Sequence, residues 1–404
     1  MPSRTKASQA SFLPILISAG IIFITVWYLA VCVLHYLSQR PLWLDENMVF
    51  ESVKTFAPGE FFTRKLAYDQ IFSKLYLFVI QRIAEPFSLS LLSVRFMSFF
   101  AMLTAFVVWM RIARQELTGR TAMLTYVLSW AGSSLLVYYS AELKPYSMDV
   151  LASGLFMIFI INADRLQKEK RPLYLLGMTL LPLLGLFSYP AFLFFIFLFY
   201  HLLATKTKDG FWLQCFLSFG IAAVIALGFV YAFDIRVARA NTSTQGFSDH
   251  IISLASIGEF FKTWWEGTMD LFSRFFAERP RIFKRLSVPF GMLAFGYMFY
   301  AFIKNFTKDG FRFQSFRTVA LLLYAELFVL GVLQKYPFAV PRTVLFFCPI
   351  VLLLIVDALM SLRKVNKISA YLLQGAYVVF LSVIAFGIAR EAWSGHLGFS
   401  PVIW

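Results

Sequence analysis

Long apolar runs separated by short polar turns form the dominant pattern along this 404-residue chain. Several of these runs approach or exceed the roughly 20 apolar residues that a helix needs to cross a bilayer. The first run is too long for the core of a signal peptide and no small-residue cleavage site follows it, so we interpret it as a retained helix. The pattern predicts about 11 transmembrane helices, near residues 12–34, 91–110, 121–139, 146–163, 172–187, 190–205, 212–233, 288–304, 317–333, 344–362 and 369–388.

The apolar segment 71–84 is too short for a confident span and contains two charged residues, Lys74 and Arg82. Counting it as a span would move every later basic cluster to the other side of the membrane. Such an arrangement would oppose the tendency of Lys and Arg to remain on the cytoplasmic side. We therefore expect residues 46–90 to form an outer-face segment whose helices lie along the membrane surface.

Together the runs predict an all-α fold, a polytopic membrane helix bundle with juxtamembrane helices on its outer face. Residues 1–388 would form this one domain, with the N-terminus inside, and residues 389–404 a short outer C-terminal tail. Aromatic residues next to basic ones in residues 234–287 predict an amphipathic helix that anchors this loop at the interface, and the alternative is a wall of the acceptor or lipid groove. The loops expected on the outer face are residues 35–90, 140–145, 234–287 and 334–343.

Composition agrees with a membrane protein and excludes a soluble globular one. Hydrophobic residues make up 59% of the chain and charged residues only 15%, with a mean hydropathy of +0.71. The net charge of +15 is explained by basic inner loops, so we expect membrane lipids and no nucleic acid among the partners. Cys32, Cys215 and Cys348 lie in or beside apolar runs, which argues against a disulfide framework or a cysteine metal site.

Two adjacent acids, Asp45 and Glu46, follow the first apolar run and are flanked by Trp43 and Leu44. Carboxylates at a membrane rim are costly to desolvate and are often retained for chemistry or ion binding. We therefore predict that this pair belongs to a functional site on the outer face.

A second group of charges lies in the turn between the predicted helices 121–139 and 146–163. Glu142 and Lys144 stand there, followed by Pro145, which is suited to the first position of a helix. Lys144 would then lie at the positive end of the helix dipole, where an anion binds favourably. A surface ion pair between Glu142 and Lys144 is the simpler alternative.

The third group is the turn 335–342, which contains Tyr336 and ends with Arg342 at the start of a helix. The planar guanidinium of arginine matches the geometry of phosphate oxygens. The alternative is that Arg342 extends toward lipid headgroups. Trp43, Tyr146 and Tyr336 lie beside these charged residues and are candidates for the wall of a substrate groove.

Carboxylates and cations at one outer interface suit the transfer of a lipid-carried group. The carboxylates can act as a base or hold a divalent ion such as Mg²⁺ or Mn²⁺, and the cations can hold a phosphate. Nucleotide-activated donors are cytoplasmic in most cells, so transfer on the far side needs a group delivered through the bilayer. A sugar on a polyprenyl phosphate meets that need, and direct displacement with one base would invert the anomeric carbon.

The order and spacing of these motifs resemble the landmarks of the GT-C glycosyltransferases, most closely family 39, which includes protein O-mannosyltransferases and aminoarabinose transferases. The similarity covers most of residues 12–362. The segments that carry it are Leu42–Glu46, Leu92–Arg95, Tyr139–Tyr146, Phe187–Pro190 and Tyr336–Phe338 with Arg342.

The resemblance implies a role for each charged residue. The catalytic residues would be Asp45, acting as base or acceptor orienter, its neighbour Glu46 in the acidic pair, and Glu142. Glu142 would assist acceptor or metal binding, and a metal, if one is used, would be held by Glu46 and Glu142. Arg342 would bind the donor phosphate. Lys144 stands where the family often has arginine, so it would contact that phosphate as a point charge.

The sequence thus predicts an inverting glycosyltransferase of the bacterial inner membrane, with its active site facing the periplasm or cell exterior. The acceptor would be a glycan, a lipid or a protein hydroxyl. The alternative is a transporter or flippase for a lipid-linked glycan. No inverted repeat or pair of broken helices supports that alternative. A ligase that uses lipid diphosphate donors and a non-catalytic scaffold are weaker alternatives.

Overall fold

The computed structural model describes residues 5–206, 209–238, 252–276, 281–309, 314–338 and 340–395. Every regular element in these ranges is a helix, which confirms the predicted all-α class. Seven segments within the described ranges are long and apolar enough to cross a membrane, so the chain is an integral membrane protein. They correspond to α1 (Thr5–Leu37), α4 (Leu91–Glu116), α7 (Tyr146–Glu169), α10 (Gly210–Phe229) with the π-helix η7 (Val230–Ile235), α13 (Arg281–Asp309), η9 (Leu345–Phe347) with α15 (Cys348–Leu362), and α16 (Lys367–Trp393).

The other four predicted helices are present but shorter or interrupted. The helix predicted for residues 121–139 is interrupted at Gly132, where a Cβ would lie 2.8 Å from the side chain of Leu381 on α16. Beyond it the Ser134 N–H donates to the carbonyl of Phe276 at 3.1 Å instead of continuing the helix. The shorter helices are α5 (Arg120–Ala131) with α6 (Ser134–Tyr138), α8 (Arg171–Leu183) with η5 (Leu184–Leu186), η6 (Tyr189–Phe194) with α9 (Phe195–Ala204), and α14 (Phe316–Val332).

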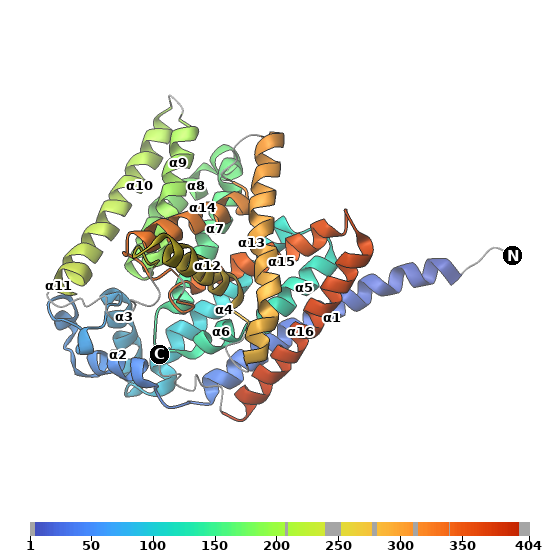
Figure 1. The fold of residues 1–404 in the computed structure, drawn as a ribbon. Coiled ribbons are helices and arrows are strands. Elements are labelled where there is room, and N and C mark those ends of the chain that lie inside the picture. Colours follow the sequence, from blue (N-terminus) through green and yellow to red (C-terminus); the bar gives the residue numbers. More distant parts are fainter. Residues whose placement is uncertain are drawn as a thin grey trace.

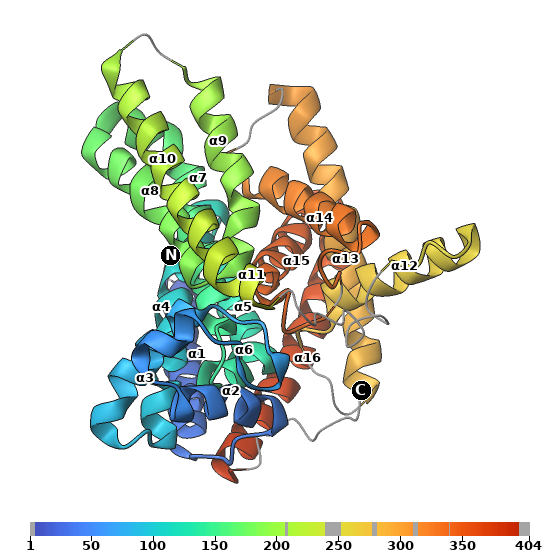
Figure 2. The same cartoon turned by 90° about the vertical axis from the view of Figure 1, so that its left-hand side faces the viewer.

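The segment between α1 and α4 folds into short helices around its own small core. Val49, Val53, Tyr76, Leu77 and Ile80 are buried in this core. Figures 1 and 2 show α2 and α3 together at one end of the bundle. Because α3 has 11 residues, it is too short to cross a bilayer, as predicted for segment 71–84. The elements are α2 (Leu44–Thr55), η1 (Pro58–Phe62), η2 (Ala67–Asp69), α3 (Lys74–Ala84) and η3 (Glu85–Phe87).

The loop 234–287 contains α12 (Ile257–Ser273), which extends away from the bundle in Figure 2. Its first half exposes Ile257 and Phe261, as an interfacial anchor would. Its end does not lie on the surface, because Leu271 and Phe272 are buried in the main core. The predicted helix is therefore present in this loop, and its role as an interfacial anchor stays a prediction.

The predicted start of the C-terminal tail needs correction, and parts of two predicted segments lie outside the described residues. Helix α16 continues to Trp393, so the tail predicted from residue 389 begins as helix. Residues 396–404 of that tail, residues 239–251 and 277–280 of the outer loop, and a few residues in other turns lie outside the described ranges.

Helices α4 and α7 pack closely side by side and both begin at the end of the bundle that carries α2. Gly154 permits this approach, since a Cβ there would lie 2.8 Å from the indole nitrogen of Trp109. That nitrogen donates to the carbonyl of Val150 at 3.1 Å. The starts of α4 and α7 are thereby fixed against α2, and the charged residues predicted for the site lie there.

Candidate functional site

Three segments far apart in the sequence bring the predicted charges together. Asp45 lies in the first turn of α2, Lys144 lies just before α7, and Arg342 lies in the turn between α14 and η9. Pro145 is the residue that caps α7, with a φ of −74°, one position earlier than predicted. Its fixed φ and missing N–H suit the start of a helix.

Asp45 bridges the two cations. Its Oδ2 atom accepts from Lys144 Nζ at 2.8 Å and from Arg342 Nη1 at 2.5 Å. Burial raises the pKa of the Asp45 carboxyl, but the two adjacent cations outweigh burial and hold that pKa below its ordinary value. The predicted meeting of these three residues is therefore present, with the carboxylate at the point where both cations converge.

Lys144 is almost completely buried, with 1% of its surface exposed. Its ammonium group lies 5.1 Å from the ring centroids of Trp43 and Phe72 and 5.7 Å from that of Tyr146. The faces of aromatic rings attract a cation electrostatically, although the rings themselves carry no net negative charge. Burial lowers the pKa of the Lys144 amine more than Glu142 and Asp45 raise it. The predicted groove residues Trp43 and Tyr146 thus form part of a cage around this cation.

The backbone at Lys144 is fixed as firmly as its side chain. Its carbonyl accepts from the hydroxyl of Tyr76 on α3 at 3.0 Å and from the hydroxyl of Ser98 on α4 at 3.1 Å. Tyr336, the third predicted groove residue, donates its hydroxyl to the carbonyl of Thr343 at 2.6 Å. Tyr336 therefore shapes the turn that carries Arg342.

Glu142 is fully buried next to this cage. Its Oε1 accepts from the indole N–H of Trp43 at 2.9 Å, whereas its Oε2 has no hydrogen-bond partner among the described residues. Burial raises the pKa of Glu142 to about 7, against the opposing effect of Lys144. Glu142 is thus a carboxyl group poised to gain or lose a proton near neutral pH.

This raised pKa makes stability depend on pH with a defined sign. The unfolded chain loses the Glu142 proton near pH 4.5, whereas the folded protein keeps it until about pH 7. The folded state therefore binds more protons in this window, so its stability falls as pH rises and levels off above pH 7. In Glu142→Gln this contribution is absent. The difference in unfolding temperature between variant and wild type should grow from pH 4.5 to pH 7 in favour of the variant, and a constant difference would refute the raised pKa.

Glu46 occupies a different environment from Asp45. It is fully buried, and its Oε2 accepts from Arg40 Nη1 and Arg95 Nη2, both at 2.9 Å. Its Oε1 accepts from Arg95 Nε at 3.1 Å and from the N–H of Leu143 at 2.8 Å. This single carboxylate joins the end of α1, the start of α4 and the turn before α7. These contacts are those of a positioning residue, and the catalytic role of Glu46 stays a prediction.

Arg40 and Arg95 are the main site residues that the sequence prediction missed. Both are buried. In the sequence, Arg95 was recognised only as part of the segment Leu92–Arg95, and no role was predicted for it. Only a general rule could have pointed to them, namely that a buried charged residue almost always has a partner of opposite charge. An arginine at the end of one apolar run and another at the start of the next suggest a shared acidic partner.

The predicted metal ligands, Glu46 and Glu142, do not form a metal-binding set. Both oxygens of Glu46 accept from arginine, so a cation there would have to displace Arg40 and Arg95. Within the described ranges, no group of three or more His, Cys, Asp and Glu side chains is placed to hold a metal ion. Dependence on Mg²⁺ or Mn²⁺ stays a prediction.

No family model and no curated protein matches the sequence. Two solved structures are similar to this protein. The crystal structure of ArnT from Cupriavidus metallidurans bound to undecaprenyl phosphate has a TM-score of 0.52 at 14% identity, over 93% of this chain and 76% of that one. This chain has the ArnT fold. The apo form of the same ArnT gives a TM-score of 0.52 at 15% identity, over 94% and 77% of the two chains. The ArnT fold confirms the GT-C type of helix bundle predicted from the sequence.

Proposed function

We propose that this protein is an inverting glycosyltransferase that moves a sugar from a polyprenyl-phosphate donor to an acceptor hydroxyl. The observation that carries the proposal is the Asp45 carboxylate held between Lys144 and Arg342. Two cations that converge on one anion at the end of a membrane bundle suit a lipid phosphate. The ArnT of the same fold supports the proposal, since its structure contains undecaprenyl phosphate.

In this proposal the Asp45 carboxylate occupies the place that the donor phosphate takes. When the phosphate binds, Lys144 and Arg342 pair with its oxygens and release Asp45. The pKa of Asp45, which these cations now hold low, then rises toward its ordinary value. A carboxylate freed in this way is a better base, so donor binding itself prepares Asp45 for catalysis.

The transfer step needs one base and a neutralised leaving group. The acceptor oxygen attacks the anomeric carbon from the face opposite the phosphate, and Asp45 takes the hydroxyl proton. A carbon–oxygen bond to the acceptor forms while the bond to the phosphate breaks. The polyprenyl phosphate leaves with the electron pair, stabilised by Lys144 and Arg342. Attack from the opposite face inverts the anomeric carbon.

The proposed orientation places this site on the outer face of a bacterial inner membrane. Arg95 at the start of α4 contacts Glu46, whereas Arg111 and Arg114 lie near the end of that helix. Because Lys and Arg favour the cytoplasmic side, the end of α4 would face inward and the site outward. A donor carried across the bilayer by its polyprenyl chain would then meet the cations at the rim.

Binding of undecaprenyl phosphate, measured by titration of the purified protein, tests this exchange. Asp45→Asn removes the competing carboxylate and should tighten binding. Lys144→Met and Arg342→Gln should weaken it by about 10- to 100-fold, because each removes a charge-assisted hydrogen bond. Arg64→Gln, in an exposed pair on the outer-face segment, is the control and should leave binding unchanged. Weaker binding by Asp45→Asn, or no effect of the other two, would contradict the proposal.

A further inference from the structure

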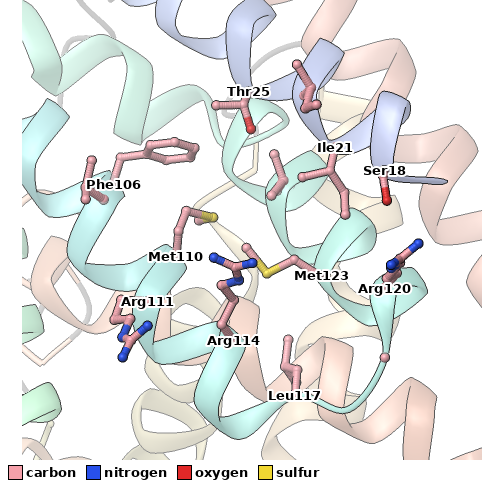
Figure 3. A pocket seen from close by; sticks show the side chains of 14 residues that line it. Ser18, Ile21, Thr25, Phe106, Met110, Arg111, Arg114, Leu117, Arg120 and Met123 are labelled. Atoms are coloured by element: carbon pink, nitrogen blue, oxygen red, sulfur yellow. The ribbon is translucent and has the colours of Figure 1, made fainter. Parts of the chain in front are cut away.

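A cavity of about 810 Å³ opens between α1, α4 and α5, away from the site described above. Its walls are mainly apolar, with Ile21 on α1, Phe106 and Met110 on α4, and Met123 on α5. Figure 3 shows the guanidinium of Arg114 beside Met110 and Met123, and Arg120 beside Ser18 of α1. The cavity thus combines an apolar wall with a cluster of cations.

The cationic end of this cavity lies in the opposite leaflet from the Asp45 site. Arg95 and Arg114 are on the same helix, α4, and nineteen residues separate them. At 1.5 Å per residue this distance is about 28 Å, close to the hydrocarbon thickness of a bilayer. Since Arg95 holds Glu46 beside the Asp45 site, Arg114 lies at the other membrane interface.

The walls of the cavity are open to lipid rather than enclosed by protein. Ile22 on α1 and Val107 on α4 line it and are 65% and 66% exposed. Exposed apolar side chains on membrane-spanning helices face acyl chains. An acyl chain can therefore enter the cavity sideways from the bilayer, a route that a free anion does not have.

The cations of the cavity have few protein partners. Arg120 donates from Nη1 to the carbonyl of Pro14 at 3.1 Å, a contact that leaves its positive charge uncompensated. Within the described ranges, neither Arg111 nor Arg114 takes part in a hydrogen bond or an ion pair.

We propose that this cavity binds one anionic diacyl phospholipid of the leaflet opposite the Asp45 site. Its phosphate lies at Arg114 and Arg120, where arginine matches phosphate oxygens, and Arg111 lies at the edge of the same cluster. One acyl chain lies along Ile21, Thr25 and Phe106. The site is separate from the donor site and does not depend on the proposed transferase activity.

Native mass spectrometry of the detergent-purified protein, titrated with dioleoylphosphatidylglycerol, tests the proposal. The wild type should bind this lipid at least about tenfold more tightly than dioleoylphosphatidylcholine, because the choline cation of that zwitterionic lipid compensates the phosphate charge that the arginines attract. Arg114→Gln should weaken phosphatidylglycerol binding about tenfold. The control Lys168→Gln removes an exposed charge at the same end of the bundle and should have no effect.

A second variant separates a lipid site from a simple anion site. Thr25→Trp fills the apolar part of the cavity without changing its charge and should also weaken phosphatidylglycerol binding. Inorganic phosphate should not compete at equal concentration. If Thr25→Trp has no effect and inorganic phosphate competes, the cavity is an anion site and the lipid proposal is wrong. Equal affinity for the two lipids, or unchanged binding by a folded Arg114→Gln, overturns it as well. Unfolding temperatures establish that each variant is folded.

Discussion

Asp45→Asn is expected to reduce sugar transfer by about a thousandfold while leaving the protein folded. A positioned base contributes on the order of 10² to 10⁴ to a rate, and asparagine cannot accept the acceptor proton. The substitution keeps the size of the side chain, so the cage around Lys144 should persist. The measurement is release of undecaprenyl phosphate when the purified protein is given a panel of undecaprenyl-phosphate sugars together with a panel of acceptor glycans, lipids and peptides.

Glu51→Gln is the matched control for this experiment. Glu51 lies on the same helix, α2, but is exposed to solvent, so its substitution should leave the transfer rate unchanged. Comparing the transfer rates of the two variants shows whether an effect comes from the position of Asp45 or from the loss of any negative charge on α2. Near-normal transfer by a folded Asp45→Asn variant would remove Asp45 from the role of base.

Glu46→Ala is expected to destabilise the fold more than any other single change in the site. The substitution leaves Arg40 and Arg95 buried without their common partner and frees the N–H of Leu143. Breaking a buried ion pair by removing one partner costs about 3–5 kcal/mol, and here two arginines lose the same partner. The unfolding temperature in detergent and the folded fraction on gel filtration should both fall sharply.

Glu60→Gln is the control for that prediction, because Glu60 also pairs with an arginine in the outer-face segment. Its pair with Arg64 is exposed, and exposed pairs contribute little to stability. The unfolding temperature of Glu60→Gln should therefore match that of the wild type. If Glu46→Ala is as stable as wild type yet lacks transfer, Glu46 is catalytic, as the sequence had predicted, rather than a positioning residue.

The sequence predicted the meeting of Asp45, Lys144 and Arg342 because membrane topology restricts where residues can lie. Each of the three follows or precedes a long apolar run, and counting the spans places all of them at the same face. Two cations and an acid confined to one interface have few alternatives to pairing. The positions of the helices were also predictable, because the length of each apolar run can be read from the sequence of that run alone.

The features that the sequence did not predict depend on contacts between distant segments. The break in the helix predicted for residues 121–139 arises where Gly132 meets Leu381. The role of Glu46 depends on Arg40 and Arg95, which approach it only when α1, α2 and α4 are packed. Adjacent acids look equivalent in a sequence, yet successive side chains on a helix point in different directions. Asp45 therefore faces Lys144 and Arg342, whereas Glu46 faces the interior of the protein.

The most direct test of the account is a structure of the protein in lipid nanodiscs with undecaprenyl phosphate. We predict that the phosphate lies within hydrogen-bond distance of both Lys144 Nζ and Arg342 Nη1. The Asp45 carboxylate should then have left these cations and should face the space beside the phosphate. A phosphate bound elsewhere, with Asp45 still paired to Lys144 and Arg342, would contradict it.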